Sequence, residues 1–138
     1  MIDNKNIDQS STFLLIPIVL GNDSIGASVT DIEQDSFRAP FSGEIVSVHA
    51  YAVAITDSDD GARIDVKKDT TSVLSATINP TAATLVAGTL KTNGTEEFVA
   101  GDKIGVFVTT GAGDSITDLS VTVVIRPYTA DRAVRPSI

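Results

Sequence analysis

The sequence predicts an all-β protein: a single antiparallel β-sandwich, jelly-roll-like, with eight or nine short strands. Valine, isoleucine and threonine favour strands, and glycine, asparagine, aspartate and proline interrupt them about every 8–12 residues, a spacing typical of sandwiches and jelly rolls. No long stretch has the apolar repeat of a helix. The 138 residues suffice for one domain with its own core. An immunoglobulin-like topology fits the same strand count, so both topologies stay open.

Three segments divide the chain. Residues 1–12 are polar and lack apolar periodicity, which predicts a flexible N-terminal arm. Residues 13–127 carry the strand patterns and are expected to form the β-sandwich domain. Pro127 ends the last strand, and residues 128–138 are expected to form a C-terminal tail.

The first strand is predicted over Phe13–Leu20. Pro17 interrupts this apolar run and donates no backbone hydrogen bond, so the strand is expected at a sheet edge or with a bulge. The residues Gly21–Asp23 predict a turn, and Ile25–Ile32 a second strand.

The longest predicted strand is Glu44–Ile55. Strict alternation places Ile45, His49 and Tyr51 on one face and Val48 on the other. Both faces are largely apolar, which predicts a central strand that is covered on both sides, either within the domain or by a neighbouring subunit.

The remaining predicted strands alternate apolar and polar residues between turn signals such as Asn93-Gly94. They cover Arg63–Lys67, Val73–Ile78, Leu85–Leu90, Glu96–Val99, Lys103–Thr109 and Leu119–Arg126.

Composition excludes several kinds of site. The chain has no cysteine, hence no disulfide or thiolate ligand, and its single histidine excludes sites that need two. A net charge of −8 and few aromatic residues argue against nucleic-acid binding. No stretch is long and apolar enough for a membrane helix, and the polar N-terminus does not resemble an export signal, so we expect a soluble protein made in the cytoplasm.

One acidic turn is a weak metal-site candidate. Asp57, Asp59 and Asp60 could hold a hard cation such as calcium, but Gly61 and Lys68 stand where an EF-hand loop requires other residues. Asp and Gly also suit a solvated hairpin turn, and we favour that interpretation. No metal site and no cofactor are therefore expected.

Four residues are candidate interface positions. His49 and Tyr51 lie in the longest strand, and no nucleophile motif accompanies His49. At an interface, His49 would make assembly pH-dependent, because histidine changes charge near neutral pH. Arg132 and Arg135 give the tail a basic character that could pair with an acidic patch on a partner or a neighbouring subunit.

Four segments together resemble small β-sandwich proteins of tailed-bacteriophage virions. They are an F-x-A-P-x-x-G-x-I opening, a V-x-K-[ND] hairpin, a V-x-A-G-D-x-I turn and a D-L-x-V-T-V final strand, at Phe37–Ile45, Val66–Asp69, Val99–Ile104 and Asp118–Val123. This group includes capsid decoration (cement) proteins and modules of head fibres or tail fibres.

The resemblance implies a structural role without catalytic residues. Decoration proteins of this kind often form trimers on the outer shell and clamp neighbouring major capsid subunits. It therefore implies a homotrimer that binds the major capsid protein of a phage head on the outer surface of the virion. The alternative is a fibre or receptor-binding module that recognises a cell-surface glycan near Tyr51 or the 57–60 turn. A hydrolase built on a jelly roll has no specific support.

Overall fold

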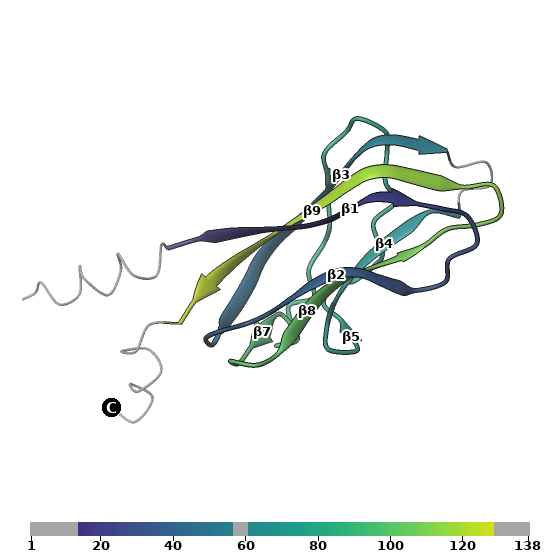
Figure 1. Cartoon of the computed structure of the whole chain (residues 1–138). Coiled ribbons are helices and arrows are strands. Elements are labelled where there is room, and N and C mark those ends of the chain that lie inside the picture. Colours follow the sequence, from purple (N-terminus) through teal and green to yellow (C-terminus); the bar gives the residue numbers. More distant parts are fainter. Residues whose placement is uncertain (1–13, 57–60, 129–138) are drawn as a thin grey trace, which may run out of the picture.

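The structure, a computed structural model, describes residues 14–56 and 61–128 and is all-β (Figure 1). Within these residues, nine strands form two facing sheets. They are β1 (Ile16–Ile25), β2 (Ile32–Arg38), β3 (Gly43–Thr56), β4 (Arg63–Lys68), β5 (Thr71–Ser72), β6 (Val86–Ala87), β7 (Glu97–Phe98), β8 (Lys103–Thr109) and β9 (Ser115–Pro127). No helix in these residues is long and apolar enough to span a membrane.

The order of the strands is that of a jelly roll. One sheet runs β1-β9-β3-β6, with β7 also pairing with β3, and the other runs β2-β8-β4-β5. The first strand thus pairs with the last, β2 with β8, β3 with β6 and β4 with β5, as if a long hairpin had been folded over on itself. This pairing confirms the predicted sandwich and decides in favour of the jelly roll over the immunoglobulin-like topology.

The core lies between the two sheets. Alternate residues of β4, β8 and β9 point into it, and the side chains of Ile64, Val106 and Val121 are fully buried. Burying one such side chain contributes about 1.5–3 kcal/mol, so these alternating strands hold the sheets together. The predicted inward positions of Arg63–Lys67 and Lys103–Thr109 are therefore confirmed.

The predicted turn after Leu20 is wrong, and so is the predicted second strand over Ile25–Ile32. β1 continues through Gly21, which pairs with Ser120, and reaches Ile25. A Cβ atom on Gly21 would lie 2.5 Å from the Leu119 carbonyl oxygen, so this glycine allows close approach of two strands instead of a turn. The edge position expected from Pro17 is confirmed, since β9 is the one described strand in the sheet beside β1.

A β-bulge in β3 changes which residues share a face. The pairing with β9 shifts register between Ile45 and Ser47. Ile45 is therefore buried together with Val48, whereas His49 lies on the opposite, outward side. Strict alternation had grouped Ile45 with His49, and that expectation is wrong.

The segment between β5 and β7 has less regular pairing than expected. The predicted strand Val73–Ile78 makes single bridges at Leu74 and Ile78, and the predicted strand Leu85–Leu90 is reduced to the two residues of β6 and a bridge at Leu90. Val73, Leu74 and Ile78 nevertheless lie in the core, and Val86 and Leu90 pack against it, whereas Leu85 is exposed. The hydrophobic side chains of Val73, Leu74 and Ile78 are thus buried, although this segment forms no continuous run of strand pairing.

Candidate functional site

Both described ends of the chain leave the sandwich together. Ile16 at the start of β1 pairs with Ile125 near the end of β9. Leu14 and Tyr128 therefore lie at the same end of the molecule, which we call the terminal end (Figure 1). Leu14 is 54% exposed and Leu15 51%, an unusual exposure for two consecutive leucines.

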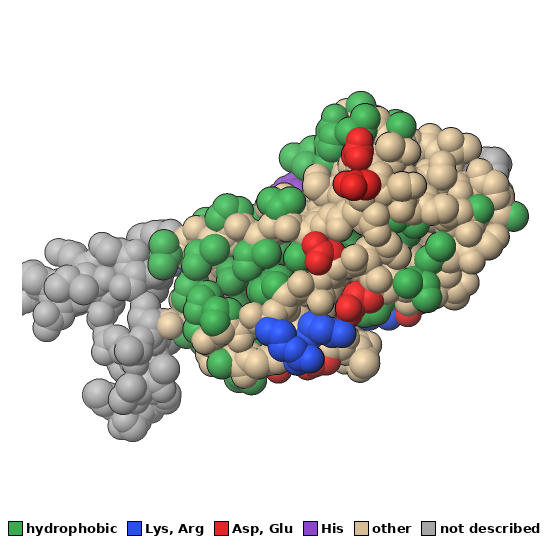
Figure 2. All heavy atoms as spheres, in the orientation of Figure 1, with side chains coloured by type: hydrophobic (Ala, Val, Ile, Leu, Met, Phe, Trp, Pro, Cys, Tyr) green, Lys and Arg blue, Asp and Glu red, His purple; other side chains and the backbone are tan. Residues whose placement is uncertain are grey.

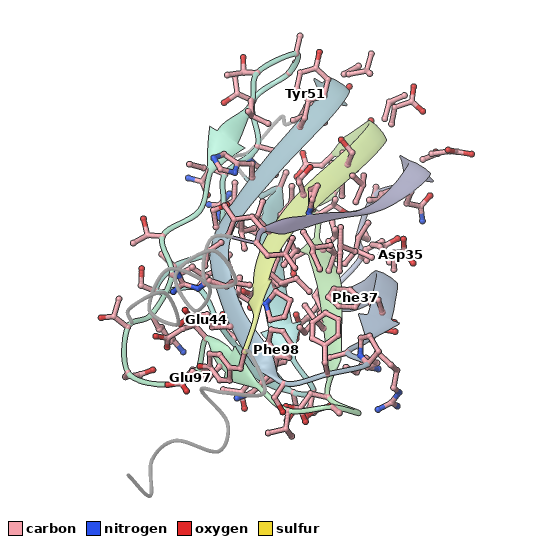
Figure 3. All side chains as sticks on the ribbon, turned by 90° about the vertical axis from the view of Figure 1, so that its left-hand side faces the viewer. Asp35, Phe37, Glu44, Tyr51, Glu97 and Phe98 are labelled. Atoms are coloured by element: carbon pink, nitrogen blue, oxygen red, sulfur yellow. The ribbon has the colours of Figure 1, made fainter. Side chains whose placement is uncertain are left out.

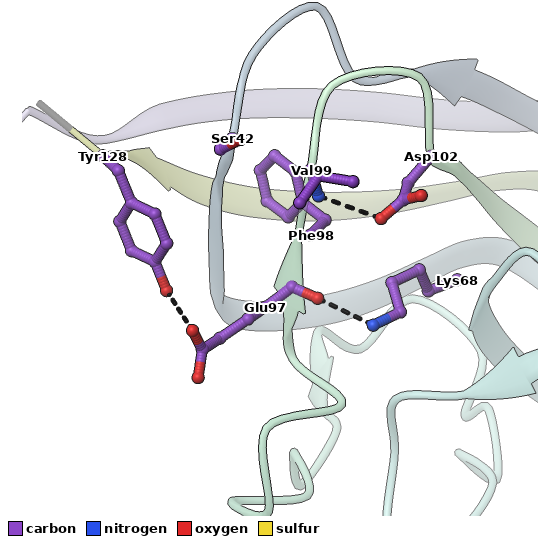
Figure 4. Close-up of a pocket in the computed structure, with 7 residues that line it drawn as sticks. All are labelled: Ser42, Lys68, Glu97, Phe98, Val99, Asp102 and Tyr128. Atoms are coloured by element: carbon purple, nitrogen blue, oxygen red, sulfur yellow. Dashed lines mark hydrogen bonds between the residues drawn. The ribbon is translucent and has the colours of Figure 1, made fainter. Parts of the chain in front are cut away.

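A largely apolar pocket of about 460 Å³ opens at the terminal end (Figure 4). Phe98 and Val99 supply apolar lining, while the Tyr128 hydroxyl donates a hydrogen bond of 2.7 Å to Glu97 Oε1. Lys68 Nζ donates to the Glu97 carbonyl oxygen at 2.8 Å. The pocket is lined by Ser42, Lys68, Glu97, Phe98, Val99, Asp102 and Tyr128. The polar groups of Tyr128, Glu97 and Lys68 thus form hydrogen bonds with one another, so the open part of the pocket offers mainly apolar surface to a ligand.

Three of the four segments that resemble phage virion proteins meet at this end. The Ala39 amide donates to the Asp102 carbonyl oxygen at 2.9 Å, and the Gly101 amide donates to the Ala39 carbonyl oxygen at 2.7 Å. The Asp69 amide donates to the Lys103 carbonyl oxygen at 2.7 Å. Backbone hydrogen bonds thus join the opening, hairpin and turn segments into one scaffold. This contact could not be predicted from the sequence, because the three segments lie far apart along the chain.

Gly43 lets β3 start inside this scaffold. A Cβ atom there would lie 2.5 Å from the Arg126 carbonyl oxygen and 2.9 Å from Phe98 Cζ. The next residue, Glu44, forms an ion pair with Arg126 across the two strands. Figure 3 places Glu44, Glu97 and Phe98 toward one end of the sheet and Tyr51 toward the other.

The second notable surface is the outer side of the β1-β9-β3-β6 sheet. Its central row joins Val19, Thr122, His49 and Ala87 across the four strands. The rows on either side are equally free of Asp, Glu, Lys and Arg. We call this surface the uncharged face; it comprises Pro17, Val19, Gly21, Ser47, His49, Tyr51, Ala87, Ser120, Thr122 and Val124.

The uncharged face combines apolar exposure with a shallow hollow. Val19 is 64% exposed, and Val53, farther along β3, is 53% exposed. A groove of about 490 Å³ runs beside His49 toward Ala87 and Leu90. The structure therefore brings the interface candidates His49 and Tyr51 onto one half-buried surface. Their role in an interface stays a prediction.

The opposite sheet has a charged outer side. Lys67 Nζ lies 2.5 Å from Asp31 Oδ2 and 4.6 Å from the centre of the Phe107 ring, and Lys103 Nζ lies 2.7 Å from Glu33 Oε1. Figure 2 shows charged side chains gathered over β2 and β8, and hydrophobic ones beside the start of β1. The first sheet has an ion pair on its outer side too, Glu44–Arg126 at the terminal end, but its central rows carry no charge.

The other candidate residues lie outside the described residues. These are the weak metal candidates Asp57, Asp59 and Asp60 and the tail residues Arg132 and Arg135. Within residues 14–56 and 61–128, no three His, Asp or Glu side chains come together in a way that could hold a metal ion.

No protein-family model matches the chain, and no curated protein does. Among solved structures, a chain described as "Capsid of Ralstonia phage GP4" has a similar fold. The alignment covers 84% of each chain with 17% sequence identity and a TM-score of 0.46. The likeness is one of fold.

Proposed function

We propose that this chain is a non-enzymatic structural protein of a phage virion, a decoration protein that binds the outside of the head and stabilises the major capsid subunits, as a trimer. The resemblance of the four sequence segments supports the phage setting. The observation that carries the assembly role is the absence of charge from the central rows of one outer side of the sandwich, where the other outer side carries ion pairs.

A sandwich that works alone in water presents polar residues on both outer sides. Here the β2-β8-β4 side carries ion pairs suited to solvent. On the other side, the Glu44–Arg126 pair lies at the terminal end, and the uncharged face exposes Val19 beside small polar residues. Exposed apolar patches mark surfaces that contact other proteins. One side therefore suits water and the other suits assembly, as a shell component requires. The net charge of −8 also disfavours contact with packaged nucleic acid and fits an outer position.

The terminal end is the surface that we assign to the capsid. Leu14 and Leu15 expose apolar side chains there, at the same end as the pocket lined by Phe98 and Tyr128. Residues 1–13 and 129–138 both continue from this end, and 13 residues can reach about 40 Å when extended. Arg132 and Arg135 would then meet acidic groups of the shell, which would reinforce attachment.

Binding to heads assembled without the chain tests this proposal. We expect the purified chain to co-sediment with such heads and to raise the temperature at which they rupture. The double variant Arg132→Ser with Arg135→Ser should bind more weakly, and the difference should shrink at high salt. The control is Thr70→Glu with Thr71→Glu, two exposed positions on the β4–β5 hairpin, because it makes the net charge more negative by the same amount.

Two results would count against the proposal. A chain that does not co-sediment at micromolar concentration does not act as a decoration protein. Specific binding on a glycan array, lost when Tyr51 is changed to Ala, would favour the alternative of a fibre or receptor-binding module. If both double variants bind like the original chain, the basic tail is not part of the attachment.

A further inference from the structure

The exposed turn before β7 places an asparagine beside groups that assist a reaction of its own side chain. Asn93 and Gly94 are both exposed, and the turn leads through Glu96 into β7. We infer that Asn93 and Gly94 form a self-catalysed modification site, at which the chain converts Asn93 to aspartate and isoaspartate through a succinimide ring. This inference goes beyond the proposed function and makes no use of the capsid.

The attacking atom is the backbone nitrogen of Gly94. Its N–H donates a hydrogen bond of 2.8 Å to Glu96 Oε1, so a carboxylate lies within reach of the proton that has to leave. Gly94 has a φ of +96°, and a Cβ atom there would meet nothing within 4 Å. Without a side chain and with open space around it, this residue leaves room for a ring to close at its nitrogen.

The atom under attack is Asn93 Cγ. Its oxygen, Oδ1, accepts hydrogen bonds from the Thr95 hydroxyl at 2.7 Å and from the Thr95 amide at 3.2 Å. Negative charge develops on this oxygen when a nucleophile adds to Cγ, and two donors directed at it stabilise that charge. The bond to the Thr95 amide also closes a ring that contains both Asn93 Cγ and the Gly94 nitrogen, so the two reacting atoms are held in one tight turn.

The reaction needs only water as a second reactant. The Gly94 nitrogen forms a bond to Asn93 Cγ while the bond from Cγ to Nδ2 breaks. The proton of Gly94 passes to Glu96 and from there to the leaving nitrogen, which departs as ammonia. Water then opens the ring: attack at Cγ gives aspartate, and attack at the former backbone carbonyl carbon of Asn93 gives isoaspartate. Each product carries one carboxylate where the chain had a neutral amide.

The two other asparagines of the described residues lack this arrangement. Asn79 is followed by Pro80, which has no N–H to give up. Asn22 lies in β1, where pairing with β9 holds the main chain extended, and its Nδ2 donates to Gln34 Oε1 at 2.9 Å. Within the described part of the chain, the reaction is therefore expected at Asn93 alone.

The turn is fixed to the strands that build the terminal end. The Glu97 amide donates to the Gly94 carbonyl oxygen at 3.1 Å, and the Ile45 amide donates to the Glu96 carbonyl oxygen at 2.9 Å. These bonds hold the backbone of Glu96 in place beside the amide that its carboxylate accepts from. Conversion of Asn93 therefore adds a negative charge close to Glu96 and to Glu97, which lines the pocket.

Peptide mapping by mass spectrometry tests the assignment. The purified full chain is incubated at neutral pH in water labelled with heavy oxygen, either folded in buffer or unfolded in urea. Ring opening introduces a labelled oxygen at position 93, so converted chains are recognised by their mass. We expect the folded chain to convert Asn93 about tenfold faster than the unfolded chain, while Asn22 of the folded chain stays unchanged.

Two variants test the assisting groups. Glu96→Gln removes the base with little change in shape and should slow conversion in the folded chain about tenfold, less than the ~100-fold of a typical catalytic base because the site is open to water. Thr95→Val removes one donor to Asn93 Oδ1 and should slow conversion several-fold. The matched control Thr92→Val, at an exposed position beside the site, should react like the original chain. In urea all three variants should react at the rate of the original chain, and circular dichroism establishes that they are folded in buffer.

The inference fails if the folded chain converts Asn93 no faster than the unfolded chain. It fails equally if folded Glu96→Gln reacts as fast as the original chain. No phage head is used in these measurements, so the modification site can fail while capsid binding holds, and the reverse can also occur.

Discussion

Replacing Gly43 with alanine should destabilise the terminal end of the sandwich. The new Cβ atom would lie 2.5 Å from the Arg126 carbonyl oxygen, 2.9 Å from Phe98 Cζ and 3.1 Å from Pro127 Cα. Two of these three atoms belong to the backbone of β9, which pairs with Gly43. A side-chain rotation therefore cannot relieve the contact, and β3 has to move away from β9 at this point.

The magnitude follows from the cost of overpacking. Extra atoms in a well-packed site typically cost about 1–3 kcal/mol, and a backbone obstacle places this substitution in the upper part of that range. For a chain of 138 residues, 1 kcal/mol corresponds to a change of roughly 3–4 °C in Tm. We therefore expect Tm to fall by roughly 6–10 °C.

Thermal and urea unfolding at one fixed protein concentration measure this effect. The matched control is Gly26→Ala, because a Cβ atom on Gly26 meets nothing within 4 Å. The control should be neutral, or stabilising by about 0.4–1 kcal/mol through the lower entropy of the unfolded chain. If Gly43→Ala unfolds within about 0.5 kcal/mol of Gly26→Ala, the close approach between β3 and β9 does not limit this position.

Two further predictions concern buried and edge hydrogen bonds. The Thr110 hydroxyl donates to the Gly26 carbonyl oxygen at 2.7 Å and accepts from the Val29 amide at 3.1 Å. Thr110→Val should therefore lower the free energy of unfolding in urea by about 2 kcal/mol. The control Thr92→Val, at an exposed position, should leave it almost unchanged. Asp35→Ala removes the acceptor of the Gly21 amide and should speed hydrogen exchange of that amide. Asp35→Asn keeps an acceptor oxygen and should preserve the protection. Equal exchange in both variants would refute the idea that the Asp35 carboxylate protects the Gly21 amide at the free edge of β1.

Much of the fold followed from local patterns in the sequence. The Lys103–Thr109 strand was predicted with the bounds that the structure gives, because its alternation is regular and its flanks carry turn residues. Pro17 predicted the edge position of β1, since a residue without an amide hydrogen is tolerated at an edge. Gly21 misled the prediction, because a glycine that permits close approach of Leu119 looks the same in sequence as a glycine in a turn.

The candidate surfaces depended more on contacts between distant residues. His49 and Tyr51 were predicted as interface residues from the apolar character of both sides of their strand, and the structure places them on the uncharged face. The pocket at the terminal end was not predicted, although three of its scaffold segments had been singled out by resemblance. Nothing local in Ala39 or Gly101 indicates that the two will exchange hydrogen bonds.

The sequence by itself determined that the chain is an acidic β-sandwich without cysteine, because composition, strand periodicity and turn residues are local properties. Only the tertiary structure decided that β1 pairs with β9, that both described ends leave together, and that charged side chains lie on one outer side while the other has none in its central rows. The physical reason is that the alternation of apolar and polar residues predicts only which residues share a face of a strand. Which face is turned to the core depends on the partner strands and on bulges such as the one after Ile45, and these are set by contacts between distant residues.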